Sequence, residues 1–261
     1  MPLRFLITAL AFAASLNALQ PAQAAGGRLE IARGEFRLRL DDGSVLAREA
    51  LVGARLVIKE GGETLRVLID SVHEEHPASG EPFVLYHLLI EETAGQGSRE
   101  ACLPDARGRR LGLPLLKESG IAFTCTSGAE GKCILMGYRP WDERADAPMR
   151  DLHAACIHML RAAYGGDDDA TTRDGTVIDV YDRFGIQLPE AVDPLPFEAA
   201  WGRDGALCVA HPRIAANVTL ADLARRYPRL RGRLGPEACT EEAMRLHPGA
   251  LLFNRSGVTA P

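Results

Sequence analysis

The chain has 261 residues, of which 46% are hydrophobic and 25% charged, and its formal net charge is −5. This length accommodates one large or two small domains with a hydrophobic core. A mildly acidic chain without a lysine cluster lacks the electrostatic footprint of a nucleic-acid-binding protein. We therefore expect no nucleic-acid partner.

The N-terminal segment, residues 1–24, has the pattern of a secretory signal peptide. A positive charge at Arg4 precedes an apolar run from Phe5 to Leu16, and small residues follow at Ala22 and Ala24. The apolar run is too short to span a bilayer. We expect cleavage after Ala24, a periplasmic or secreted location, and no transmembrane segment in the mature chain.

Residues 25–100 are predicted to be rich in β-structure. Phe36, Leu38 and Leu40 alternate with charged neighbours, and further alternating runs follow as far as Glu91. Short alternating runs separated by glycine-containing turns favour an antiparallel sheet, as a sandwich or an open barrel. The loop-rich stretch that follows suggests a domain boundary near residue 100, although one continuous domain remains an open alternative.

Residues 101–261 are predicted to mix helices and strands. Apolar residues at spacings of three and four predict a helix over 147–164, with Asp146 as its N-cap and Gly165 as its stop. A nine-residue connection from Cys125 to Cys133 suggests a hairpin tied by a disulfide. The remaining predicted elements are a strand over 176–181 after the Asp174-Gly175 turn, a short helix over 197–201, a strand over 206–210, and helices over 220–227 and 240–246.

Together these patterns predict an α+β fold. An antiparallel, β-rich N-terminal half packs with a mixed helix-strand C-terminal half.

Six cysteines in a chain with a leader pattern favour disulfides over free thiols. They lie at Cys102, Cys125, Cys133, Cys156, Cys208 and Cys239. Cys125 and Cys133 form the favoured pair because they are close in sequence, and the pairing of the other four stays open. A histidine three residues before Cys156, His153, makes an activated thiolate conceivable, but Cys156 lies on the apolar stripe of the predicted helix, where structural cysteines are commoner.

Other polar groups offer weaker sites. Asp174 and Asp179 belong to an acidic turn, residues 167–182, that could bind calcium or supply a carboxylate pair, but its spacing does not fit an EF-hand. His73, His76 and His87 could be assembled into a metal site, although histidines spread over a loop and a strand are more often exposed or core residues. We therefore expect no cofactor.

A run of arginines between Arg225 and Arg233 indicates a solvated helix face, and anion or membrane binding there is the less favoured reading.

Several segments resemble one known family. They include Phe123-Thr-Cys-Thr-Ser-Gly-Ala, Gly137-Tyr-Arg-Pro-Trp141, Asp174-Gly-Thr176 and Phe197-Glu-Ala-Ala-Trp201. In this order they resemble the bacterial ADYC domain proteins, named for an Ala-Asp-Tyr-Cys motif, where this chain has Ala162, Ala163, Tyr164 and Gly165.

The resemblance implies an exported bacterial protein with disulfides, and it transfers no catalytic residue because the family has no established activity. If the acid and thiol of the motif act as a catalytic unit in relatives, this member should be inactive. If that thiol is structural, Cys239 is an available substitute partner.

The favoured function is an exported, disulfide-stabilised binding or structural module with an unidentified partner. Tyr138, Trp141 and Trp201 are the candidate ligand contacts, because they offer aromatic contact area without an accompanying catalytic set. The alternative is an extracytoplasmic hydrolase that uses the acidic turn, assisted by calcium.

Overall fold

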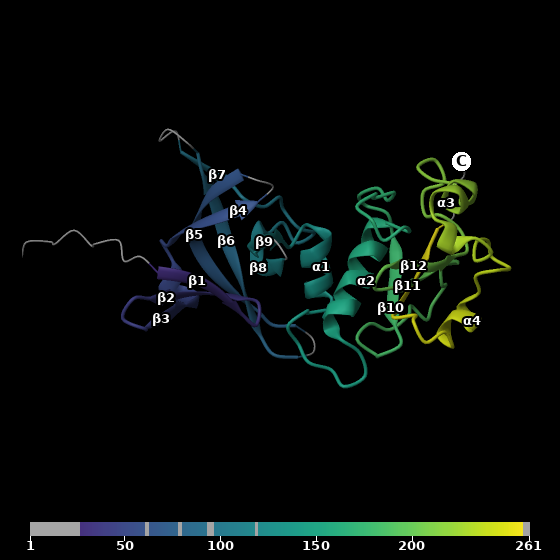
Figure 1. Cartoon of the computed structure of the whole chain (residues 1–261), viewed down its shortest axis with the longest axis horizontal. Coiled ribbons are helices and arrows are strands. Elements are labelled where there is room, and N and C mark those ends of the chain that lie inside the picture. The colour runs from purple at the N-terminus through teal and green to yellow at the C-terminus, as the bar shows by residue number, and fades with distance from the viewer. Residues whose placement is uncertain (1–26, 61–62, 78–79, 93–96, 118–119, 258–261) are drawn as a thin grey trace, which may run out of the picture.

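The computed structural model describes residues 27–60, 63–77, 80–92, 97–117 and 120–257. The expected signal peptide lies outside these residues. Figure 1 shows one group of strands at the N-terminal end of the molecule, a second group of strands with short helices at the C-terminal end, and two helices between them. The predicted α+β fold with a β-rich N-terminal half is confirmed.

A small antiparallel sheet opens the fold. It contains β1 (Gly27–Ala32), β2 (Glu35–Leu40) and β3 (Val45–Ala47) in that order, followed by the 3-10 helix η1 (Arg48–Leu51). Side chains alternate between the two faces of a strand. Phe36 and Leu38 of β2 therefore pack into the core, while Glu35, Arg37 and Arg39 lie on the opposite face.

The larger sheet is antiparallel and has the order β4-β5-β6-β8-β9, with β7 also paired to β6. Its strands are β4 (Arg55–Glu60), β5 (Glu63–Glu75), β6 (Phe83–Glu91), β7 (Ser98–Glu100), β8 (Leu111–Lys117) and β9 (Gly120–Cys125). Strands on both sides of residue 100 pair in this sheet. The division of the chain at residue 100 stays a prediction.

The C-terminal half combines helices with a third antiparallel sheet of order β10-β13-β11-β12. Its elements are α1 (Ala129–Leu135), α2 (Met149–Arg161), β10 (Ile178–Asp182), β11 (Phe197–Gly202), β12 (Gly205–Val209), α3 (Leu220–Arg226), η2 (Pro228–Leu230), α4 (Glu241–Arg245) and β13 (Leu252–Ser256). Among the described residues, every helix is too short or too polar to cross a bilayer.

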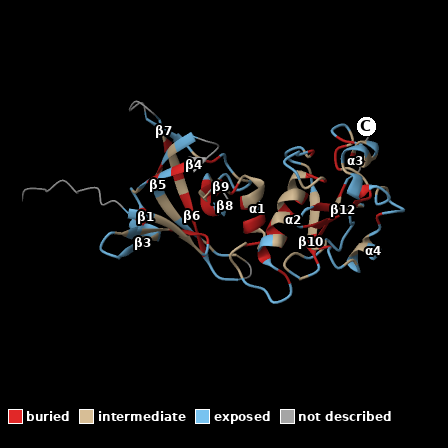
Figure 2. Ribbon diagram, in the orientation of Figure 1, coloured by how far each residue is buried: buried red, intermediate tan, exposed pale blue. Residues whose placement is uncertain are grey.

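The described residues form four hydrophobic clusters, three of which show how the halves pack. One fills the space between the N-terminal sheets around Phe36 and Tyr86, and another packs α2 against the C-terminal sheet around Trp201. A third joins the two halves, because Ile134 of α1 packs against Phe83 and Leu85 of the large sheet. Figure 2 shows these buried positions along the strands and on α1 and α2.

The predicted helix around residue 155 is confirmed, but both of its predicted ends are wrong. Pro148 is the N-cap of α2, and Asp146 instead forms an ion pair with Arg144 at 2.8 Å. The helix ends at Ala162, which adopts the left-handed conformation with φ of 49°. The Ala162 carbonyl accepts a hydrogen bond from the Thr171 hydroxyl at 2.7 Å, which ties this helix end to the following loop.

Two other local predictions are wrong, and both errors come from tertiary contacts. Residues after Cys125 form a turn and helix α1 rather than a hairpin. The segment 197–201 is strand β11, not a helix, because it lies between β12 and β13 and pairs with both. The strand at Cys208 is confirmed, as are α3 and α4, whose N-caps Thr219 and Thr240 accept hydrogen bonds from the first turns.

The favoured disulfide between Cys125 and Cys133 is wrong. All six cysteines are paired, as Cys102–Cys125, Cys133–Cys156 and Cys208–Cys239. Cys133 lies on the buried side of α1 facing α2, whereas Cys125 ends β9 beside the segment that follows β7. Helix formation between these two cysteines therefore directs their sulfur atoms to different partners.

Candidate functional site

A cavity of about 540 Å³ lies where the small sheet meets the segment that follows α1. We call it the arginine groove, because Arg33, Arg37, Arg48 and Arg139 line it together with Trp141. A second cavity of about 500 Å³ shares the side of the groove formed by Arg33, Arg139 and Trp141. Seven of the eleven lining residues of the groove are charged, which excludes a purely apolar ligand.

The turn between β1 and β2 places Arg33 at the groove. Arg33 and Gly34 have φ values of 51° and 74°, which is the pattern of a two-residue type I′ hairpin turn. Asn, Asp and Gly favour such positions, whereas another L-residue pays roughly 1–2 kcal/mol for the left-handed conformation. The turn itself therefore gives no reason for an arginine at position 33.

Two glycines make room for the groove's largest side chains. The Trp141 ring packs over Gly34, where a Cβ atom would lie 2.5 Å from the ring, and it meets Phe83 edge-to-face. The Arg139 guanidinium packs against Gly80 and lies 5.7 Å from the centre of the Phe83 ring. These contacts hold Trp141 and Arg139 between the two halves of the chain.

The arginines of the groove differ in their partners. Arg48 forms an ion pair with Glu35 at 2.8 Å, and Arg139 forms one with Asp142 at 2.7 Å. Among the residues that the structure describes, Arg33 has no ion pair, and the buried Nε of Arg37 has no hydrogen-bond acceptor.

The nearest acid in the strand register does not satisfy Arg37. Glu30 lies opposite Arg37, but Arg39 holds both carboxylate oxygens of Glu30, at 3.0 and 3.1 Å. A buried donor without an acceptor costs about 1–3 kcal/mol. The groove therefore has donor capacity left for an acceptor brought by a ligand.

Trp141 is the only one of the three candidate contact aromatics that lines this cavity. Tyr138 and Trp201 are fully buried, and each uses its polar atom internally. The Tyr138 hydroxyl donates to Asp182 at 2.9 Å, and the Trp201 indole donates to Asn254 at 2.8 Å. The proposed contact role can therefore be pursued for Trp141 alone.

Several carboxylates of the acidic turn are engaged with neighbouring side chains. Asp167 accepts from the Tyr227 hydroxyl at 2.8 Å, and Asp169 pairs with Arg226. Asp179 lies 3.4 Å from Arg255, and Asp174 occupies an exposed turn.

The histidine metal site and the reactive thiol at Cys156 can also be compared with the structure. Within the described ranges, no group of three or more potential ligands could hold a metal ion, and His87 instead lies between Asp70 and Glu100 at 2.9 and 2.8 Å. Cys156 forms a disulfide with Cys133, so the hypothesis of an activated thiolate beside His153 is wrong.

The arginine run after α3 is only partly a solvated face. Arg225 is exposed and pairs with Asp222 at 2.6 Å. Arg229, in contrast, donates to the backbone carbonyls of Tyr164 and Asp204 at 2.9 and 3.0 Å. Arg229 therefore ties this region to the end of α2.

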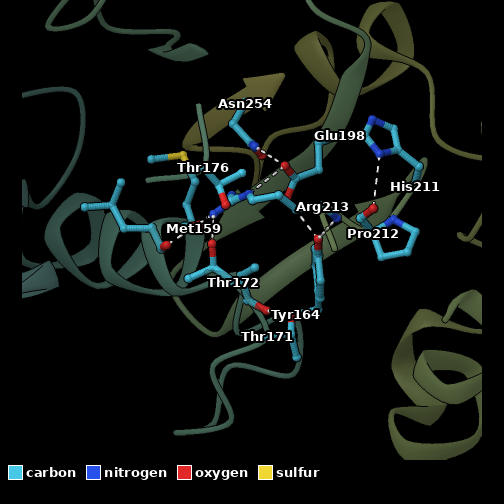
Figure 3. Close-up of polar contacts among 12 residues, drawn as sticks. Met159, Tyr164, Thr171, Thr172, Thr176, Glu198, His211, Pro212, Arg213 and Asn254 are labelled. Atoms are coloured by element: carbon cyan, nitrogen blue, oxygen red, sulfur yellow. Dashed lines mark hydrogen bonds and ion pairs between the residues drawn. The ribbon is translucent and has the colours of Figure 1, made fainter. Parts of the chain in front are cut away.

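A second polar cluster lies inside the C-terminal half (Figure 3). The Arg213 and Glu198 side chains are 1% and 0% exposed and form an ion pair at 3.0 Å. Arg213 also donates to the backbone carbonyls of Met159 and Leu160 at 2.8 and 3.2 Å, which lie at the C-terminal end of α2. Glu198 accepts from the Asn254 amide at 2.6 Å.

Tyr164 completes this buried cluster. Its hydroxyl donates to Glu198 at 2.9 Å and accepts from the Arg213 backbone N–H at 2.9 Å, while its ring stacks on Trp201. Burial, with the nearby Glu198 carboxylate, raises the pKa of Tyr164 well above its usual value. Because these charged groups are paired and inaccessible to solvent, the cluster is a structural element of the core.

Gly165, next to Tyr164, stands where the signature has its cysteine. A Cβ atom at Gly165 would lie 2.2 Å from the Tyr227 ring, so this ring occupies the space that a side chain at position 165 would take. Residues 48–215 match the ADYC domain family. The chain belongs to the ADYC domain family. Searches of curated proteins and of solved structures found no match.

In this ADYC domain, Tyr164 is thus a core anchor of the signature segment. Sequence reasoning did not identify the arginine groove, because its arginines come from separate segments of the chain. The one local signal was the Arg33-Gly34 pair between two alternating runs, where Asn-Gly would be the usual turn.

Proposed function

We propose that this ADYC domain is an exported, periplasmic or secreted binding module whose ligand occupies the arginine groove. Three disulfides support an oxidising compartment, and the leader pattern of residues 1–24 supports export.

The observation that carries this proposal is the combination of spare donors and an aromatic side chain in one cavity. Arg33 and Arg37 form no ion pair with a described residue, and both line the cavity together with Trp141. A cavity of about 540 Å³ is within the range of small-molecule sites, roughly 300–1,000 Å³. We do not propose a hydrolase, because Asp167, Asp169 and Asp179 already hold arginine or tyrosine side chains.

Tryptophan fluorescence tests the binding site directly, since the chain has two tryptophans and Trp201 is fully buried. We expect at least one member of a panel of soluble sugars and oxyanions to change the emission of the wild-type protein. Trp141→Phe should remove that change while keeping an aromatic ring beside Phe83. A panel without any response, or a response that survives in Trp141→Phe, would contradict the proposed site.

Export is tested separately on protein expressed from the full chain in a bacterium. We expect an N-terminus at Ala25, recovery from the periplasm or the medium, and no thiol that reacts before reduction. Recovery from the cytoplasm with residues 1–24 intact and six reactive thiols would contradict this part of the proposal.

A further inference from the structure

The charge balance of the arginine groove indicates what kind of ligand it takes. Glu35 and Asp142 are neutralised by Arg48 and Arg139. The other lining charges are two arginines, Arg33 and Arg37, and the exposed Glu81, which forms no ion pair with a described residue. The lining therefore carries one excess positive charge, which favours a polar ligand with one anionic group.

Arg37 is the strongest indication of an anion. Its Nε is buried without an acceptor, while Arg39, two residues along the same strand face, is fully used by Glu30. Buried donors are nearly always paired in folded proteins. Because this Nε is shielded from solvent, a carboxylate in the groove would bind through the terminal N–H groups of Arg37, which lines the cavity. Guanidinium groups bind carboxylates through paired hydrogen bonds.

Arg33 adds a second, independent indication. It holds a left-handed turn position that Asn would occupy with less strain, so its side chain rather than its backbone explains the residue. It lines the groove together with Arg37.

Trp141 indicates the rest of the ligand. Its ring is fixed by Gly34 and Phe83 and lines the cavity beside the charged residues. An aromatic side chain offers a flat apolar surface to the face of a ligand ring. The Glu81 carboxylate can accept hydrogen bonds from hydroxyl groups.

We propose that the arginine groove binds an acidic sugar, with its carboxylate on Arg33 and Arg37 and its ring against Trp141. This rests on the proposed function, in which the groove is the binding site. A nucleic acid fits less well, because three carboxylates line the groove and the chain is acidic overall. Inorganic phosphate would satisfy the arginines but would leave Trp141 unused.

Paired ligands that differ in one group test this inference. Glucuronate and glucose differ by a carboxylate in place of a hydroxymethyl group, and inorganic phosphate supplies an anion without a ring. Titration calorimetry of the full mature chain should show glucuronate binding at least tenfold tighter than glucose and than phosphate. Trp141→Phe should weaken glucuronate binding and leave phosphate binding unchanged.

Two variants and one control locate the carboxylate. Arg37→Gln should weaken glucuronate binding at least tenfold and leave glucose binding unchanged. Arg33→Asn should weaken it several-fold without lowering the melting temperature, because Asn accepts the left-handed conformation. Arg39→Gln, on the same strand but held by Glu30 outside the cavity, should leave the affinity unchanged.

Each other result has a defined meaning. Glucose binding as tight as glucuronate, lost in Trp141→Phe, overturns the acidic-sugar inference and keeps the groove as a binding site. Phosphate binding as tight as glucuronate also overturns it, as does equal weakening by Arg39→Gln. Absence of binding by all three probes contradicts the inference, and the wider panel then decides the proposed function. If Arg37→Gln does not fold, Arg33→Asn decides the outcome.

Discussion

Arginines serve opposite purposes in the two halves of the molecule. In the C-terminal half, Arg213 is buried and bonded to Glu198 and to the end of α2. In the N-terminal half, Arg33 and Arg37 line a cavity and keep donor capacity, because Glu30, Glu35 and Asp142 are held by other arginines and Glu81 forms no ion pair with a described residue. A charge with complete internal bonding fixes a core, whereas a charge with spare donors beside a cavity is available to a ligand.

The largest effect should come from breaking the buried pair. Arg213→Met leaves Glu198 without its cation in the core, and we expect the free energy of unfolding to fall by about 3–5 kcal/mol in urea denaturation. Arg225→Met, at an exposed ion pair, is the control and should change it by less than about 0.5 kcal/mol. Adding Glu198→Gln to Arg213→Met should recover part of the loss. Equal, small effects at positions 213 and 225 would remove the contrast between the two halves.

The disulfides allow a matched comparison of the halves. Cys102–Cys125 and Cys133–Cys156 both have a sequence separation of 23, so loop-closure entropy gives each about 3.5 kcal/mol. Cys133 and Cys156 are both fully buried, whereas Cys125 is half-buried. We expect the double alanine variant of the 133–156 pair to lose more stability in urea than that of the 102–125 pair. The reverse order would show that the N-terminal half depends more strongly on its cross-link.

Tyr164→Phe measures what the signature tyrosine contributes to the core. The change leaves Glu198 short of one donor and the Arg213 N–H without its acceptor, so we expect a loss of about 1–3 kcal/mol. Tyr227→Phe removes a similar bond, from a tyrosine to Asp167, in an exposed setting, and should cost less. Calorimetric melting of both variants makes the comparison, and a larger loss in Tyr227→Phe would contradict a structural role for Tyr164.

The smallest effect should be a pH dependence in the N-terminal half. Desolvation opposes the charge on His87, but the hydrogen bonds that its ring donates to the Asp70 and Glu100 carboxylates raise its pKa above 6.5 overall. A raised pKa in the folded state means that this stabilisation is complete below about pH 6.5 and is lost as the pH rises through the folded value. Melting temperatures from pH 5 to 9 should show a fall that His87→Gln reduces.

The control for His87 is His73→Gln, because His73 is exposed and its ring forms a hydrogen bond with the Ser71 hydroxyl and no ion pair with a described residue. It should leave the pH profile unchanged. A wild-type profile identical to that of His87→Gln would show that the two carboxylates do not hold His87 in its charged form.

Local sequence patterns determined those elements that depend mainly on interactions between residues close in sequence. Alternating apolar residues specified the N-terminal strands, and the 3.6-residue period specified α2. Hydroxyl caps at Thr219 and Thr240 specified the starts of α3 and α4, since a cap needs only its own first turn. The cysteine count also indicated oxidised pairs, because only composition and compartment enter that inference.

Only the tertiary structure decided the features that depend on distant partners. The segment at Glu198 became a strand through pairing with β12 and β13, and the turn after Cys125 became a helix that sent Cys133 to Cys156. The arginine groove arose because folding brings Arg37 and Trp141 to one cavity from positions over a hundred residues apart. Neither periodicity nor spacing encodes such a contact, since it depends on how whole elements pack.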